Sequence, residues 1–161
     1  MHVEGVPCLT DNYAYIVTCD VTGRTVVVDP SEPEPVLKAL DSGHKALSAI
    51  LCTHHHFDHS GSAAEVHALT GAKVVAHRAE TIVNDDDTMT LRQGTEGEHI
   101  PFWYRWIVGA PRRRQFHIEF PRIEVHEALN EGDKLDLFEG VHVLHTPGHT
   151  PGSVCLLVNG P

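Results

Sequence analysis

The sequence has little cysteine, and its few cysteines are scattered. They include no C-x-x-C pair and lie in mostly apolar or strand-like segments, at Cys8, Cys19, Cys52 and Cys155. At 161 residues and 41% hydrophobic content, the chain has enough apolar material for one core but is too short for two ordinary domains. We therefore expect reduced thiols, no disulfide framework, and one globular domain over residues 1–161.

Positive charge is also scarce, and long apolar runs are missing. Lys and Arg total 12 against 22 Asp and Glu, for a formal net charge of -10, so a phosphate backbone is repelled and a nucleic-acid partner is disfavoured. No stretch approaches the ~20 apolar residues of a membrane helix, and residues 1–15 do not resemble a signal peptide. We expect no membrane contact and a cytoplasmic protein, or an organelle protein whose targeting segment is absent here.

Histidine, by contrast, is abundant and clustered. The chain has 14 histidines, and seven of them fall in two short windows, residues 53–59 and 142–149. Imidazole is a common metal ligand and a common acid or base in catalysis, so both windows are candidates for a functional site.

The pattern of apolar residues predicts an α/β fold. Residues 47–53 form a nearly continuous apolar run typical of a strand buried on both faces, followed by a helix from residue 60 or 62 to about 69 and a strand at 73–77. This is a βαβ unit, in which a ligand site lies beyond the carboxyl ends of the strands. The other expected elements are a hairpin of 13–18 with 24–29, a helix at 35–41, and strands at 134–138, 141–146 and 153–158.

Residues 85–122 interrupt this pattern. They hold six of the ten aromatic residues, including Trp103 and Trp106, and six arginines balanced by six acids. We interpret the segment as an insertion within the domain. It serves either as a small aromatic core or oligomer contact, or as a lid over the substrate.

The first histidine window contains the pattern H-x-H-x-D-H. His54 and His56 are two residues apart in an extended segment, project the same way and can bind one ion. Asp58 and His59 follow after the chain turns into the helix, and they can face a second ion nearby. The segment therefore predicts ligands for two metals at the mouth of a buried strand.

The second window supplies a further ligand for the first ion. His149 lies in a loop of glycines and prolines, residues 146–152, between two expected strands. A catalytic ion needs three protein ligands and an open position, and His149 completes that set with His54 and His56. We interpret the other candidate histidines as surface, outer-shell or half-buried residues: His55, His67, His77, His142 and His145.

The two windows also resemble a known family. Residues 53–59 together with 146–153 are similar to the metal motifs of the metallo-β-lactamase superfamily, and residues 6–15 and 26–30 resemble the opening of its glyoxalase II family. The resemblance covers roughly 1–84 and 124–161. It implies an αββα sandwich, one metal held by His54, His56 and His149, and a second held in part by Asp58 and His59. It places Asp29 in the outer shell.

By the same resemblance, the activity is metal-dependent hydrolysis of a thioester, S-D-lactoylglutathione being the expected substrate. Two Zn²⁺ ions are expected in a complete site, with Fe or Mn as alternatives, and Asp58 orients the nucleophile as a catalytic residue. The family continues with a bridging Asp, a later His and glutathione-binding residues that have no match before Pro161. We therefore expect only the first half of the sandwich, inactive alone.

Three alternatives stay open on sequence grounds. A persulfide dioxygenase of the same superfamily would use a single iron. A superfamily nuclease is disfavoured by the net charge, although residues 112–114, three consecutive arginines, could contact phosphate. The third alternative is an inactive metal-binding fragment. The oligomeric state is not predicted.

Overall fold

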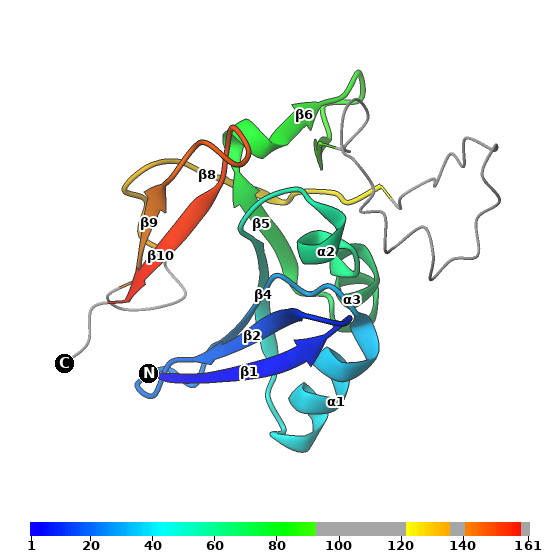
Figure 1. Cartoon of the computed structure of the whole chain (residues 1–161), viewed down its shortest axis with the longest axis vertical. Coiled ribbons are helices and arrows are strands. Elements are labelled where there is room, and N and C mark those ends of the chain that lie inside the picture. The colour runs from blue at the N-terminus through cyan, green and yellow to red at the C-terminus, as the bar shows by residue number, and fades with distance from the viewer. Residues whose placement is uncertain (93–121, 136–140, 159–161) are drawn as a thin grey trace, which may run out of the picture.

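The computed structural model describes residues 1–92, 122–135 and 141–158, and its main feature is a six-stranded mixed sheet (Figure 1). The sheet has the order β1-β2-β3-β4-β5-β8, in which the pairings from β1 to β3 are antiparallel and those from β3 to β8 are parallel. The strands are β1 (His2–Cys8), β2 (Asn12–Thr18), β3 (Thr25–Val28), β4 (Leu47–Cys52), β5 (Lys73–His77) and β8 (Glu127–Leu129). β4, which is apolar apart from Ser48, lies inside the sheet between β3 and β5, and its last four residues are buried.

Helices cover one face of this sheet: α1 (Pro33–Ser42), α2 (Phe57–Ser60) and α3 (Ala63–Thr70). Val36 and Val66, from α1 and α3, are fully buried in one cluster with Ile16, Ile50 and Val74 of the sheet. Both long helices end at glycine, as the sequence indicates, and Gly71 after α3 adopts the left-handed backbone that favours glycine. This packing fixes the turn from β4 into α2, where the H-x-H-x-D-H segment lies.

A second layer of strands covers part of the opposite face. The antiparallel hairpin of β9 (Val141–His145) and β10 (Val154–Val158) contributes Val143 and Val154 to a buried cluster with Val28 and Leu51. Helices, mixed sheet and hairpin thus form three successive layers, visible in Figure 1. They correspond to three layers, αββ, of the expected αββα sandwich.

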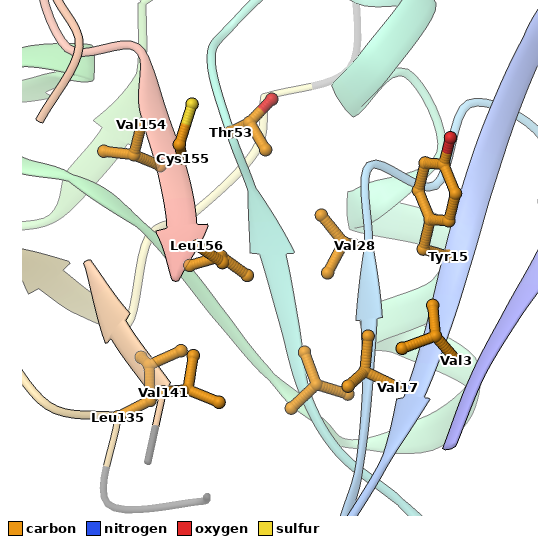
Figure 2. A pocket seen from close by; sticks show the side chains of 11 residues that line it. Val3, Tyr15, Val17, Val28, Thr53, Leu135, Val141, Val154, Cys155 and Leu156 are labelled. Atoms are coloured by element: carbon orange, nitrogen blue, oxygen red, sulfur yellow. The ribbon is translucent and has the colours of Figure 1, made fainter. Parts of the chain in front are cut away.

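A cavity of about 370 Å³ lies between the sheet and the hairpin (Figure 2). Its lining is almost entirely apolar and comes from both layers, for example Tyr15 and Val28 from one and Val141 and Leu156 from the other. Thr53, the first residue of the histidine loop, also lines it. The hairpin therefore stands partly away from the sheet while its loop reaches the carboxyl ends of the parallel strands.

Several elements differ from the sequence expectations. Strands β1 and β8 were not predicted, and the strand expected at 134–138 appears in the described part only as a bridge from Lys134 to His142. The start of the expected insertion contributes to a small hairpin of β6 (Thr81–Val83) with β7 (Met89–Leu91). Residues 93–121 lie outside the described residues, so the aromatic insertion stays a prediction. No helix in the described ranges has the length and apolarity to cross a membrane.

Candidate metal centre

The candidate site forms where three neighbouring parallel strands end. Asp29 follows β3, the His54–His56 segment follows β4, and Glu80 closes a 3-10 turn, η1 (Arg78–Glu80), after β5. His149 comes from the connection between β9 and β10 on the other layer. Because parallel strands present their carboxyl ends at one edge, residues distant in sequence meet here.

The three histidines expected to bind one ion lie together. The ligand atoms of His54, His56 and His149 are all within 4.8 Å of one another. The rings are arranged edge to face, with centroid separations of 4.8 Å for His54 and His56, 4.9 Å for His54 and His149, and 4.6 Å for His56 and His149. His54 is buried and His149 is exposed, so the group opens to solvent on one side, as a catalytic metal position requires.

The hydrogen bonds around His54 leave one ring nitrogen free to be a ligand. The Thr53 hydroxyl donates to Asp29 Oδ2 at 2.6 Å, so its oxygen accepts the proton of His54 Nδ1 at 3.1 Å. The Nε2 atom then carries a lone pair. It is the one buried side-chain nitrogen or oxygen without a hydrogen-bond partner in the described ranges. Burial and the nearby His59 lower the pKa of His54 to about 4, so the ring is neutral at pH 7.

A second group of ligand atoms is formed by Asp29, His54 and His59, again within 4.8 Å of one another. Asp29 is buried, and its carboxylate accepts the Thr53 backbone N–H at 2.7 Å and contacts His59 Nδ1 at 3.0 Å. The hydrogen bond to Asp29 raises the pKa of His59. It also directs the His59 Nε2 atom outward, which is how outer-shell carboxylates orient metal-binding histidines.

Asp58 lies at the exposed side of this second group. Its Oδ2 atom is 3.7 Å from His59 Nε2, so the two proposed ligands of a second ion are adjacent. The Asp58 backbone oxygen accepts hydrogen bonds from Asn12 at 2.6 Å and Ser31 at 2.5 Å. Asn12, the first residue of β2, therefore supports the site from the start of that strand.

Glu80 is the residue that sequence reasoning missed. It is fully buried, and its carboxylate contacts His55, Thr150 and Gly152 from both histidine loops. Burial raises the pKa of Glu80, but the hydrogen bonds from His55 and Thr150 outweigh this and hold the pKa at about 2. His55 points to Glu80 and is absent from both ligand groups. The one signal for this role is the burial of Glu80. A three-residue turn is too short for its sequence to show which side chain is buried.

The low pKa of Glu80 predicts acid-sensitive folding. Its ionised form is favoured in the folded chain, so it contributes stability above its unfolded pKa near 4.5, and this is lost as pH falls toward about 2. Urea unfolding of the metal-free chain should show the free energy of unfolding decreasing over this window. The decrease should be smaller in Glu80→Gln. If the free energy of unfolding of that variant fell with pH as steeply as that of the unchanged chain, the low pKa assigned to Glu80 would be contradicted.

Four other histidines of the described ranges lie in two pairs away from these groups. His77 and His145 stack with ring centroids 4.0 Å apart, and His67 and His126 lie 4.4 Å apart. Neither pair is part of a group of three or more potential ligands in the described ranges.

The family model for the metallo-beta-lactamase superfamily matches residues 9–161, nearly the whole chain. The chain belongs to this superfamily. Both histidine loops lie within the matched range, and the layered fold agrees with it.

Among curated proteins, this chain is similar to several hydroxyacylglutathione hydrolases. It is 36% identical over 121 residues to the one from Rhodospirillum rubrum, covering 65% of this chain and 47% of the relative. The match to the Bdellovibrio bacteriovorus protein is 45% identical over 145 residues, 86% of this chain and 57% of the relative. The Arabidopsis thaliana protein, named as cytoplasmic, is 28% identical over 99% of this chain and 48% of its own length. The chain spans about half the length of these relatives.

Solved structures show the same fold. The BLEG-1 B3 metallo-beta-lactamase matches with a TM-score of 0.64 and 25% identity, over 96% of this chain and 66% of that one. TTHA1623, in a di-iron-bound form, matches with a TM-score of 0.56 and 26% identity over 92% and 63%. ETHE1 from Myxococcus xanthus has a TM-score of 0.64 over 98% and 53%, but at 18% identity it shows the fold alone.

Proposed function

We propose that the protein carrying this chain is a metal-dependent thioester hydrolase, that S-D-lactoylglutathione is its substrate, and that it acts in the cytoplasm. The curated relatives named hydroxyacylglutathione hydrolase support the reaction and the substrate, and the Arabidopsis protein supports the location. The single observation that carries the metal dependence is the orphaned Nε2 atom of His54, buried among histidines from two loops. A divalent ion is the partner that this donor set fits.

In this proposal, His54, His56 and His149 hold the first ion, and Asp58 and His59 contribute to the second. When bound, a divalent ion supplies a nucleophile at neutral pH by lowering the pKa of water, and it polarises the thioester carbonyl. Asp58 is the catalytic residue because its exposed carboxylate lies at the solvent side of the group, where it can orient the attacking oxygen. Asp29 holds His59 and the Thr53 backbone in place.

The two-ion arrangement favours a hydrolase over a dioxygenase with one iron. The residues beside the first group, Asp58 and His59, are a carboxylate and an imidazole whose ligand atoms lie 3.7 Å apart. Zn²⁺ accepts both ligand types, and so do Fe and Mn. Metal loading distinguishes among these three metals. The likeness to ETHE1 reaches only the fold and does not favour oxygen chemistry.

Metal loading tests the proposal directly. The protein, stripped with a chelator and reloaded with Zn²⁺, Mn²⁺ or Fe²⁺, should bind the first ion more tightly than the second. The protein carrying this chain should hydrolyse S-D-lactoylglutathione only when loaded, as measured by loss of thioester absorbance. Equal hydrolysis by stripped and loaded protein, or oxygen uptake with a persulfide in place of hydrolysis, would refute it.

A further inference from the structure

Glu80 touches both loops that carry the candidate ligands of the first ion. Its Oε2 atom accepts the His55 backbone N–H at 2.8 Å and contacts the His55 ring. Its Oε1 atom accepts the Thr150 hydroxyl at 2.7 Å and the Gly152 backbone N–H. Each carboxylate oxygen therefore serves one loop: Oε2 the loop of His54 and His56, and Oε1 the loop of His149.

From this geometry we propose that Glu80 is a positioning residue that sets the distance between His149 and the histidine pair, an inference that rests on the metal site proposed above. Its side-chain hydrogen bonds reach His55, Thr150 and Gly152, which are neighbours of the proposed ligands in the two loops. A backbone hydrogen bond between the loops, from the Val154 N–H to the Thr53 oxygen at 3.1 Å, lies at the base of the loops, next to the strands. Glu80 joins the residues adjacent to the ligands themselves, at positions 55 and 150.

The surroundings of Glu80 are built to accept a side chain of this shape. A Cβ atom on Gly152 would lie 2.7 Å from Glu80 Cγ and 2.8 Å from its backbone nitrogen, so only glycine allows the loop to approach so closely. The Glu80 backbone is also held, since its oxygen accepts from the Arg92 N–H at 2.7 Å. A fully buried carboxylate whose two oxygens are both satisfied has little freedom to move, which suits it to define a spacing.

Charge and acceptor capacity, not shape alone, are needed at this position. The backbone N–H groups of His55 and Gly152 can only donate hydrogen bonds, and they face opposite oxygens of Glu80. In Glu80→Gln, the side-chain amide must present its own N–H groups to one of these donors, whichever way it is oriented. One of the two loops then loses its anchor although the volume is unchanged.

The test measures Co²⁺ affinity and visible absorption of the purified chain, with folding checked by circular dichroism. Glu80→Gln should weaken Co²⁺ binding about 10- to 100-fold, the usual range for an outer-shell partner, and should change the absorption intensity. Glu65→Gln, an exposed change on α3, is the matched control and should leave both unchanged. If Glu80→Gln does not fold, Thr150→Val provides the test, because it removes only the hydroxyl on the His149 side and should weaken binding about 3- to 10-fold.

A double-mutant comparison separates positioning from a general structural role. In a His149→Ala background the spacing of the two loops no longer matters for the ion, so Glu80→Gln should then change Co²⁺ affinity less than about twofold. An equal loss with and without His149, or Co²⁺ binding by Glu80→Gln as tight as in the unchanged chain, would overturn the inference while leaving the metal site intact. Failure of the unchanged chain to bind Co²⁺ would overturn both.

Discussion

Replacing His56 with alanine should weaken binding of the first ion by more than about 100-fold and, in the complete protein that carries this chain, abolish the proposed thioester hydrolysis. His56 is one of three imidazoles whose ligand atoms lie within 4.8 Å, and its removal leaves two. Loss of an outer-shell partner typically costs 10–100-fold in affinity, so loss of a direct ligand should exceed about 100-fold. Isothermal titration with Zn²⁺ and hydrolysis of S-D-lactoylglutathione measure the two effects.

The matched control for this prediction is His142→Ala. His142 lies on β9 in the same hairpin as the His149 loop and is absent from both ligand groups. Its replacement should leave the Zn²⁺ affinity within about twofold, whereas His54→Ala should behave like His56→Ala. Tight Zn²⁺ binding by His56→Ala would contradict the proposal that His56 is a ligand of the first ion.

Replacing Asp29 with alanine should cause the largest loss of stability among the site variants, with a loss of the second ion. The buried carboxylate accepts the Thr53 backbone N–H and hydroxyl and contacts His59 Nδ1. Leaving such donors unsatisfied costs about 1–3 kcal/mol each, so we expect the free energy of unfolding to fall by about 2–4 kcal/mol. The backbone of Asp29 has φ 52, which aspartate tolerates better than alanine does, and this adds to the loss.

Asp29→Asn separates the carboxylate from the backbone strain. Asparagine tolerates the left-handed backbone but offers one acceptor oxygen in place of two, so its loss of stability should be smaller than that of alanine. Its effect on the second ion should persist, because His59 loses the charged partner that orients it. Urea unfolding and metal stoichiometry check both. Equal stability of Asp29→Ala and the unchanged chain would contradict the role assigned to Asp29.

The histidine motifs could be placed from the sequence because their information is local. His54 and His56 alternate along an extended segment directly after the apolar run of β4, and His149 sits in a glycine- and proline-rich loop after β9. A buried parallel strand must end at the sheet edge where sites form, so the sequence alone was enough to predict which edge would carry the candidate ligand histidines. The same local signals predicted α1 and α3 closely, because proline and glycine mark helix ends.

Strands β1 and β8 show where local signals fail. β1 alternates between exposed and buried residues only in its second half, and β8 has three residues, too few for a periodic pattern. Both are strands because a neighbour pairs with them: β2 along the full length of β1, and β5 beside β8. Edge strands of this kind depend on the sheet they join.

What the sequence alone determined about this protein is which loops carry the candidate ligands and which donor groups they offer, since side-chain type and spacing suffice for both. Only the tertiary structure decided what holds the loops together. Asp29 lies 30 residues from His59, and only the family resemblance placed it near the site. Glu80 lies 70 residues from Thr150 and looks like an ordinary surface acid in sequence. They become buried acceptors only when the strand ends converge, because burial and hydrogen bonding across the sheet edge are properties of the folded chain.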